Sequence, residues 1–399
     1  MTRDERQTQS LNAWAIQGYQ GCLQAVTGFG KTRVAMMALR GLNKKSLITS
    51  ATVTVPTIVL KEQWEKELES FGVKEFTKVV VNNTAAMYPE EYECDLLICD
   101  EVHTVPTETR NVILDISHKY FLGLSATIKR QDGKHEEIIE RYPVFDVVGF
   151  EECLANGWIS PYKIYNVGVD MPEDLMAEYQ KANRQFKHVA AQISLYGADT
   201  MRTAQQWAST GSDSEKAMSA RYYANMNKRK ILCINNPNKV NIVEKIVSLC
   251  PDRYGIVFSQ SVEFADSITN AVGDSAVTFH SKMTKKIQKE ILDDFKDLES
   301  NTRIISSVQA LDAGFDFVEL SLAIVAAGYS SQLTNIQRIG RTVRAKEGKD
   351  AIIINLYSKG TQEETWLEKR QKGTKNVQYI QMSHLMEILN ETSNQLHTS

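Results

Sequence analysis

The sequence lacks any paired-cysteine motif. Its six cysteines are scattered along 399 residues, with no C-x-x-C pair and no histidine at the spacing of a zinc site. A disulfide framework or a structural zinc site is therefore not expected to hold the fold together. We expect reduced, structural thiols, as in a chain that folds in the cytosol.

Two further features are missing: a long apolar run and an excess of positive charge. No stretch of about 18 apolar residues occurs, and the first residues, MTRDERQTQSLNAW, are polar. We therefore expect a cytoplasmic protein without a membrane span or a signal peptide. Lysine and arginine number 46 against 49 aspartate and glutamate, a net charge of −3. This balance argues against a globally basic nucleic-acid coat protein but leaves room for a local basic groove.

Apolar runs of strand length alternate with amphipathic stretches of helix length in both halves of the sequence. This alternation is typical of α/β domains with parallel sheets. Strands are expected at 21–26, 45–55, 77–81, 95–99, 120–125 and 144–149, and again at 161–169, 253–259, 275–280, 302–308, 320–328 and 350–357. Between the two sets, residues 171–228 have a helical, polar pattern, and an exposed loop is expected at 209–216.

The length favours two domains. The pattern predicts a first α/β lobe over 1–150 and a second α/β lobe over 231–360. A linker strand followed by a helical insertion is expected over 151–230, and a helical tail over 361–399.

The segment AVTGFGKT, residues 25–32, fits the phosphate-binding pattern G-x-x-x-x-G-K-[ST] from Gly30 onward, with Ala25 in place of the first glycine. An apolar strand leads into it and a helix follows, so backbone N–H groups can surround phosphates at the helix N-terminus. Lys31 is expected to reach the β- and γ-phosphates, and Thr32 to bind Mg²⁺. The candidate nucleotide-binding residues are Thr27, Gly28, Phe29, Gly30, Lys31, Thr32 and Arg33.

The segment LLICDEVH, residues 96–103, is an apolar strand that ends in two adjacent carboxylates. This is the usual position of the acidic residues that complete a phosphate-loop site. Asp100 is expected to hold Mg²⁺, and Glu101 to orient and deprotonate the attacking water. His103 follows the pair and is a candidate for coupling hydrolysis to other parts of the protein.

The motif order AVTGFGKT, VPTIVL, DEVH, LSAT and QRIGRTVR resembles that of superfamily 2 helicases and translocases of the DExH type, and it covers most of the chain. Within that superfamily, residues 56–68, 123–133 and 152–164 look most similar to the XPB and UvsW-type phage recombination helicases. The resemblance implies two RecA-like lobes, ATP with Mg²⁺ in the cleft between them, and nucleic acid lying across both. The helical insertion read from the pattern of 171–228 is expected between the lobes or on the second one.

The resemblance assigns roles to three polar residues of the first lobe. Gln7 matches the glutamine that reads adenine, and its amide can both donate and accept hydrogen bonds. An ordinary helical glutamine remains the alternative. Ser125 and Thr127 match hydroxyl groups that couple the hydrolysis site to the nucleic-acid path; taken alone they would be turn formers.

The expected helix at 57–72 begins with a motif that contacts the nucleic-acid backbone in the resembled family. Pro56 and Thr57 match that motif, and backbone contacts of this kind do not depend on base sequence. Trp64, farther along the same helix, is assigned to the core rather than to base stacking.

The second half carries a segment, SSVQALDAGFD, that resembles the family motif sensing both nucleotide and nucleic acid. Gly314 and Asp316 are its best matches, and Ser307 is the candidate nucleic-acid contact within it. The same run also reads as a simple buried strand end. His280, at the end of another strand, is either a nucleic-acid contact or a structural histidine.

QRIGRTVRA, residues 337–345, places Arg338, Arg341 and Arg344 three apart, so that on a helix they share one face. Alone, this spacing fits a nucleic-acid-facing helix at least as well as a catalytic site. In the resembled family, Gln337 lies near the attacking water, and Arg341 and Arg344 approach the γ-phosphate from the opposing lobe. The resemblance leaves Arg338 without an assigned role.

Together these features predict an ATP-driven nucleic-acid motor with ATP and Mg²⁺ as cofactors. The similarity to XPB and UvsW favours DNA as the partner, in branched, forked or duplex form, with unwinding, branch migration or remodelling during recombination, repair or replication. An RNA helicase is the alternative within this class, and a regulatory ATPase without motor activity is the alternative outside it. The chain is expected to be a monomer that acts alone or with recombination and replication proteins.

Overall fold

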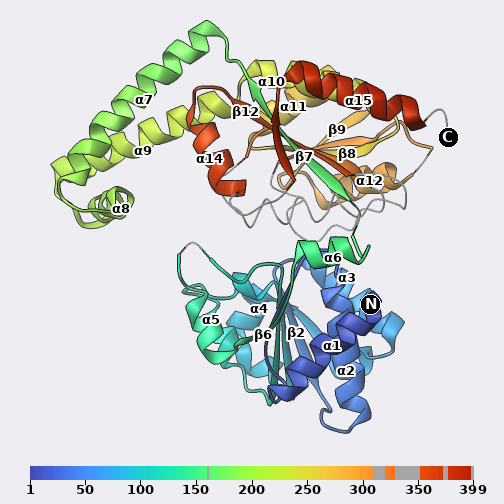
Figure 1. Cartoon of the computed structure of the whole chain (residues 1–399). Helices are drawn as coiled ribbons and strands as arrows, with labels where there is room; N and C mark the ends of the chain where they lie inside the picture. Colours follow the sequence, from blue (N-terminus) through green and yellow to red (C-terminus); the bar gives the residue numbers. More distant parts are fainter. Residues whose placement is uncertain are drawn as a thin grey trace. The chain divides into compact units, whose positions relative to one another are not determined.

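The structure is a computed structural model of the chain, and it describes residues 1–130, 132–159, 161–297, 299–308, 320–328, 351–371 and 376–396. The described residues divide into two compact units (Figure 1). The first contains residues 1–162, and the second consists mainly of residues 163–308, 322–328 and 352–396. Each unit is built on its own sheet, which confirms the predicted α/β fold class.

Six strands form the sheet of the first unit, in the order β3-β2-β4-β5-β1-β6. They span Gln20–Ala25 (β1), Ala51–Val55 (β2), Thr77–Val81 (β3), Leu96–Asp100 (β4), Tyr120–Ser125 (β5) and Val144–Val148 (β6). The strand pairs described in this sheet are parallel. The carboxyl ends of β1, β4 and β5 therefore meet at one edge, where the glycine-rich loop, the acidic pair and Ser125 lie.

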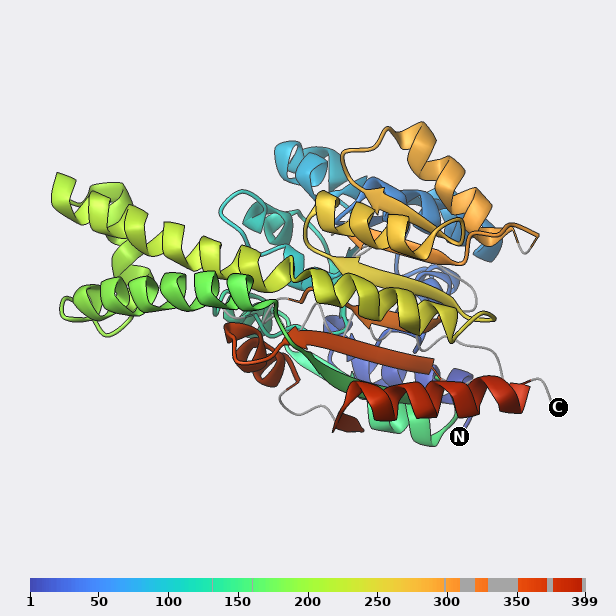
Figure 2. The ribbon, with the colours of Figure 1, turned by 90° about the horizontal axis from the view of Figure 1, so that it is seen from above.

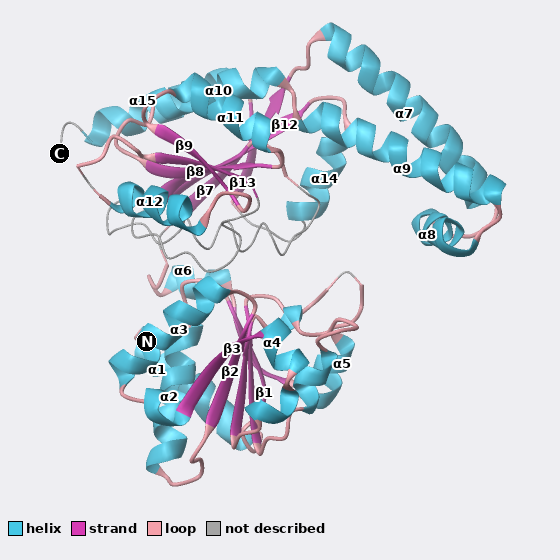
Figure 3. Ribbon diagram, turned by 180° about the vertical axis from the view of Figure 1, so that it is seen from behind, coloured by secondary structure: helices cyan, strands magenta, loops and turns pink. Residues whose placement is uncertain are grey.

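Helices cover both faces of this sheet, with α1, α2 and α3 on one face and α4 and α5 on the other (Figure 3). They span Arg3–Ile16 (α1), Lys31–Lys44 (α2), Ile58–Phe71 (α3), Asn82–Met87 (α4), Glu136–Arg141 (α5) and Phe150–Ala155 (α6). The expected helix at 57–72 is α3, which begins after a Thr57 cap and ends at Gly72 in a left-handed conformation.

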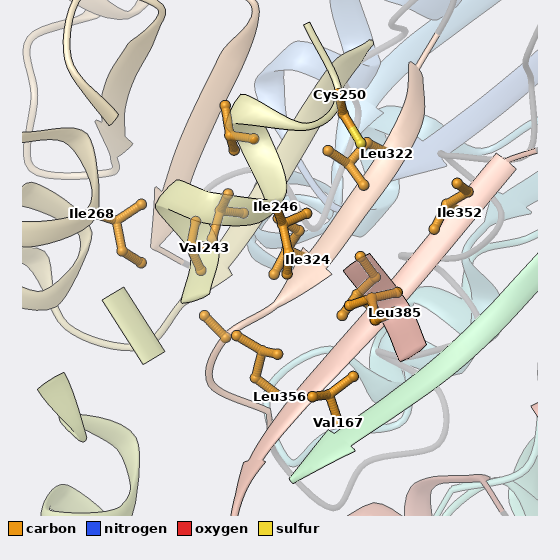
Figure 4. Packing of buried hydrophobic residues seen from close by; sticks show 14 of the residues in the cluster. Val167, Val243, Ile246, Cys250, Ile268, Leu322, Ile324, Ile352, Leu356 and Leu385 are labelled. Carbon is orange, nitrogen blue, oxygen red and sulfur yellow. The ribbon is translucent and has the colours of Figure 1, made fainter. Parts of the chain in front are cut away.

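Seven strands form the sheet of the second unit, in the order β13-β7-β12-β11-β8-β10-β9. They span Tyr162–Val169 (β7), Tyr254–Ser259 (β8), Ala276–His280 (β9), Ile304–Val308 (β10), Leu320–Val325 (β11), Ala351–Ser358 (β12) and Val377–Ile380 (β13). The accompanying helices are Pro237–Ser248 (α10), Val262–Val272 (α11), Lys285–Lys296 (α12), Gln362–Gln371 (α14) and Met382–Leu396 (α15). Apolar side chains of α10, α11 and α15 pack on β7, β11 and β12 and form one core (Figure 4).

Three helices inserted between β7 and α10 form an arm, defined here as residues 173–234. They span Glu173–Ser194 (α7), Thr200–Thr210 (α8) and Asp213–Ile234 (α9). In two views, α7 and α9 lie side by side and extend away from the sheet of the second unit (Figures 1 and 2). The arm has its own small core, formed by Val189, Ile193, Ala204, Trp207 and Tyr222.

Three features differ from the sequence expectations. The strand expected to be a linker, β7, is a member of the second sheet, between β13 and β12. The tail expected to be helical contains the edge strand β13, paired with β7. The loop expected at 209–216 is only two residues long, because Ser212 and Glu215 form a capping box that starts α9.

None of the helices in the described part of the chain combines the length and apolar character that a bilayer crossing needs.

Candidate nucleotide-binding site

The glycine-rich loop connects β1 to α2 at the carboxyl edge of the first sheet. Gly28 and Gly30 have φ angles of 94° and 92°, in the left-handed region that favours glycine. A Cβ on Gly30 would lie 2.6 Å from Nε2 of Gln7, so a larger residue would displace that side chain. The first turn of α2 has no side-chain cap, which leaves the N–H groups at its start to a ligand.

Lys31 is the first residue of α2, and its Nζ donates to the carbonyl oxygen of Ala25 at 3.0 Å. Ala25 is the buried last residue of β1, so the amine lies over the loop. Thr32 follows Lys31 and is partly buried, as is Thr27 in the loop. Arg33 instead points to the surface and forms an exposed ion pair with Asp4, at 3.0 Å.

Gln7 connects α1 to the glycine-rich loop through a side-chain hydrogen bond. Its side chain is fully buried, and Nε2 donates to the carbonyl oxygen of Phe29 at 2.8 Å. Oε1 of Gln7 has no hydrogen-bond partner in the part of the chain that the structure describes. Phe29 is itself fully buried, with its ring 6.0 Å from that of Trp158, so it supports the loop from below.

Asp100 ends β4 and is only 7% exposed. Its Oδ2 accepts from the indole Nε1 of Trp64 at 2.8 Å, and its Oδ1 accepts from the backbone N–H of Glu101 at 2.9 Å. Burial and the neighbouring charge of Glu101 raise the pKa of Asp100 to about 6, although the Trp64 bond and the Lys31 charge oppose the rise. The positive charge near Asp100 is therefore too small to offset the effects of burial and of Glu101 on its carboxylate.

Glu101 has a φ of 48°, a left-handed conformation that is unusual for a residue with a side chain. Its Oε2 lies 3.3 Å from Nδ1 of His103 and 3.5 Å from Oγ of Ser125. His103 Nδ1 and Ser125 Oγ are 2.8 Å apart, and Ser125 also donates to the carbonyl oxygen of Thr127 at 2.8 Å. Two motifs that are 22 residues apart therefore meet in one hydrogen-bonded cluster.

The residues at this edge fit a magnesium ion bound together with phosphates. Among the described residues, no group of three or more His, Cys, Asp or Glu could hold a metal alone. Mg²⁺ in phosphate-loop sites uses one or two protein oxygens and completes its shell with phosphates and water. Asp100, with its underneutralised buried carboxylate, and Thr32 at the loop have the chemistry of that smaller ligand set.

The candidate nucleic-acid residues lie at other places in the two units. The hydroxyl of Thr57, which follows Pro56, caps α3 by accepting from the N–H of Leu60 at 3.3 Å. His280 ends β9 and Ser307 lies in β10. Nδ1 of His280 and Oγ of Ser307 are buried and have no partner within the described ranges. Several predicted residues lie outside the described residues: Gly314, Asp316, Gln337, Arg338, Arg341 and Arg344.

Two contacts at the site were not anticipated from the sequence. Arg6 bonds Asp146 at 2.6 Å and Glu152 at 2.5 Å, which fastens α1 next to Gln7. Trp64 lies in the core, as predicted, with 1% of its surface exposed, and its bond to Asp100 is the second unexpected contact. Neither contact could be predicted from neighbouring residues in the sequence, because each joins segments that are distant in the chain.

A parallel sheet with a phosphate loop after β1 and an acidic pair after β4 defines a RecA-like P-loop ATPase unit. This unit, the motifs and the comparisons that follow support a superfamily 2 helicase most similar to XPB, and with it the class of nucleic-acid-dependent ATPases. Residues 1–92 match the family model described as type III restriction enzyme, res subunit, and residues 238–346 match the helicase conserved C-terminal domain.

Curated relatives support this assignment. The DNA 3'-5' translocase XPB2 of Sulfurisphaera tokodaii is 29% identical over 89% of this chain and 81% of its own length. The DNA 3'-5' helicase XPB of Mycobacterium tuberculosis is 23% identical over 93% of this chain. The chain spans only 63% of the Mycobacterium relative, and 51% of a putative DNA 3'-5' helicase Rad25 from Haloarcula marismortui.

Solved structures share the fold at low sequence identity. Dbp5 of S. cerevisiae, bound to RNA and ADP BeF3, has a TM-score of 0.62 at 12% identity and covers 96% of this chain and 92% of its own. The Hef helicase domain of Pyrococcus furiosus has a TM-score of 0.56 at 17% identity and covers 90% of this chain and 96% of its own. These similarities establish RecA-like lobes and carry no information on substrate.

Proposed function

We propose that this chain is an ATP-driven DNA translocase or helicase that moves 3' to 5' and unwinds, branch-migrates or remodels forked and branched DNA. One observation carries the proposal: three strand ends bring Lys31, Asp100, Glu101 and Ser125 to one sheet edge, where His103 bridges Glu101 and Ser125. The names of the relatives from Sulfurisphaera and Mycobacterium support DNA as the polymer and the 3'-to-5' direction.

We assign each residue at the sheet edge a separate role in ATP hydrolysis. Lys31 and the N–H groups at the start of α2 bind the phosphates of ATP. The free acceptor of Gln7, which is unpartnered among the described residues, suits the amino group of adenine. Mg²⁺, when held by Thr32 and Asp100, supplies neutralisation of the phosphate charge. Glu101 orients the attacking water and takes its proton.

The cluster of Glu101, His103, Ser125 and Thr127 is proposed to couple hydrolysis to nucleic-acid movement. A proton or charge change at Glu101 alters what His103 Nδ1 bonds, and Ser125 passes that change to the backbone of Thr127. The distances of 2.8 to 3.5 Å allow this chain of contacts to respond without rearranging the strands.

The remaining roles rest on the resemblance to the family. Pro56, Thr57, His280 and Ser307 are proposed to contact the nucleic acid, and Gly314 and Asp316 to sense the nucleotide. Gln337, Arg341 and Arg344 are proposed to complete the phosphate site as water-positioning and charge-neutralising groups. The chain is proposed to work as a monomer, alone or with recombination and replication proteins.

The test is a comparison of ATP hydrolysis with different polymers as activators. Purified protein is assayed alone and with single-stranded DNA, duplex DNA, forked DNA, four-way junctions and RNA of equal length. We expect DNA to stimulate hydrolysis, with forked or four-way DNA strongest. Stimulation by RNA alone would replace the proposal with an RNA helicase, and no stimulation by either polymer would leave a regulatory ATPase.

A further inference from the structure

Trp64 contributes a buried hydrogen bond to a group that the proposed mechanism uses. Its side chain is 1% exposed, and its indole N–H donates to Oδ2 of Asp100 at 2.8 Å. Tryptophan can only donate, and an ionised carboxylate can only accept, so the direction of this bond is fixed. The other oxygen of Asp100 accepts from the backbone N–H of Glu101. Both oxygens are therefore oriented, and each keeps a lone pair for a further ligand.

Trp64 is carried by a helix with well-defined ends. The hydroxyl of Thr57 caps the start of α3, and Gly72 ends it in a left-handed conformation. Trp64 lies about two turns after Thr57, roughly 10 Å along the helix axis. One helix thus joins a proposed nucleic-acid contact at its start to the carboxylate at the end of β4.

We propose that Trp64 is a positioning residue that fixes Asp100 for Mg²⁺ and connects that carboxylate, through α3, to nucleic acid bound at Pro56 and Thr57. This inference rests on the proposed function. A nucleic-acid backbone that displaces the start of α3 shifts the indole N–H, and with it the orientation of the Asp100 carboxylate. The stimulation of hydrolysis by DNA then has a physical route within the first unit.

The competing explanation is that Trp64 only fills the core. The same unit offers a matched control in Trp14, which is also 1% exposed and on a helix. The indole N–H of Trp14 donates to the backbone carbonyl oxygen of Phe121 at 2.9 Å, instead of to a side-chain carboxylate. Replacing either tryptophan by phenylalanine removes one buried indole bond, and only one of the two replacements changes Asp100.

The first experiment measures magnesium directly. Mg²⁺ is titrated into protein saturated with N-methylanthraniloyl-ADP, and the nucleotide fluorescence reports binding. We expect Trp64→Phe to weaken Mg²⁺ by roughly tenfold or more, as is typical when a group supporting a metal ligand is removed. Trp14→Phe is expected to retain the wild-type Mg²⁺ affinity, and thermal unfolding checks that both variants fold. Equal Mg²⁺ affinities in the two variants would overturn the positioning role.

Trp64→His provides a second variant, because imidazole keeps a ring N–H donor. An Mg²⁺ affinity for Trp64→His nearer to wild type than that of Trp64→Phe supports the donor as the cause. If Trp64→Phe does not fold, Trp64→Met, which also lacks a ring donor, is compared with Trp14→Met. Equal Mg²⁺ affinities in that pair would also reject the inference.

The second experiment tests the connection to nucleic acid. ATP hydrolysis by Trp64→Phe is measured at saturating Mg²⁺, with and without forked DNA. We expect basal hydrolysis to recover at high Mg²⁺, while the stimulation by DNA falls several-fold at an unchanged half-activating DNA concentration. Wild-type stimulation in this variant would contradict the link through α3. Failure of the wild-type protein to bind Mg²⁺ with nucleotide, or to respond to DNA, would instead reject the proposed function.

Discussion

At the residue scale, Asp95 shows how one carboxylate can fix the start of two strands. It precedes β4, and its Oδ1 pairs with Nζ of Lys119 at 2.6 Å. Its Oδ2 accepts from the N–H groups of Thr49 and Ser50, at 2.7 and 3.2 Å, just before β2. The bonds from Lys119 and Thr49 hold the pKa of Asp95 well below its usual range, although burial opposes them.

We expect Asp95→Asn to lower the free energy of unfolding by about 1–3 kcal/mol at pH 7, because an acceptor for backbone N–H groups loses its charge. The lowered pKa in the folded state stabilises the protein above the unfolded pKa of about 3.9. This contribution is lost as the pH falls through the folded pKa. Urea unfolding of both proteins at pH 7, 4 and 3 should therefore show a difference that starts to shrink below pH 4.

Asp115→Asn is the matched control for this prediction. Asp115 also pairs with a cation, Arg141, at 2.7 Å, but its side chain is 61% exposed. An exposed pair of this kind contributes about 0–1 kcal/mol, so we expect little change at any pH. A loss of stability in Asp95→Asn that did not vary with pH would show that packing, and not the ionised carboxylate, is responsible.

At the element scale, helix α7 of the arm presents a basic face. Lys181, Arg184 and Lys187 are exposed and lie opposite the buried side of the helix. None of the three forms an ion pair with a residue that the structure describes. The acids of α7 are at its start, where Glu178 already pairs with Lys228. Three exposed basic side chains, without an ion pair among the described residues, can therefore bind the negatively charged phosphates of a nucleic acid.

We expect the triple variant with serine at 181, 184 and 187 to bind forked DNA roughly tenfold or more weakly at physiological salt. The dependence of the logarithm of affinity on the logarithm of salt concentration should become shallower by up to about three, one for each lost phosphate contact. Fluorescence anisotropy at several salt concentrations measures both quantities. Hydrolysis without DNA should be unchanged, because the arm is distant in the chain from the phosphate loop.

The control variant replaces three lysines at the edge of the first sheet where its strands begin. Lys44 and Lys45 lie at the end of α2, and Lys74, which precedes β3, forms an ion pair with the exposed Glu69. Serine at these three positions should leave the affinity for DNA and its salt dependence close to wild type. If the two triple variants lost affinity equally, the effect would be one of net charge and the basic face of α7 would have no special role.

Strands were predictable where the apolar run was long and bounded by turn residues. β3 and β5 begin and end where the sequence places them, and most other strands agree within three residues. β13 was missed because VQYI is short and lies at an edge, where only one side needs to be apolar. The loop expected at 209–216 was too long, because that polar run contains a helix cap as well as a turn.

At the scale of the whole molecule, the apolar runs predicted the strands whose ends meet at the sheet edge. Parallel strands bring their carboxyl ends together, so Lys31, Asp100 and Ser125 lie at one edge because each ends or follows such a strand. The bond from Trp64 to Asp100 and the pairing of Arg6 with Asp146 depend on how helices pack against the sheet. Such contacts are set by tertiary structure and have no periodic signature.

Lys31 and Arg341 lie in different family matches, over 1–92 and 238–346. Lys31 lies in the first and is expected to bind the phosphates in the ground state. Arg341 lies in the second, outside the described residues, and the family resemblance assigns it to the charge that develops during transfer. The two residues should therefore fail differently when replaced by alanine.

We expect Lys31→Ala to abolish tight binding of N-methylanthraniloyl-ATP, and with it hydrolysis. Arg341→Ala should keep that affinity within about threefold, while kcat falls by roughly 10³ or more, because an arginine finger acts mainly in the transition state.

Arg338→Ala is the control for the segment, since it removes the same guanidinium at a neighbouring position without an assigned phosphate contact. Fluorescence titration gives the affinities, and phosphate release at saturating ATP and DNA gives kcat. A severe loss of nucleotide affinity in Arg341→Ala, or equal losses of kcat in the two arginine variants, would count against a finger at Arg341. Retained affinity with lost turnover would divide ground-state binding and transition-state stabilisation between the two halves of the chain.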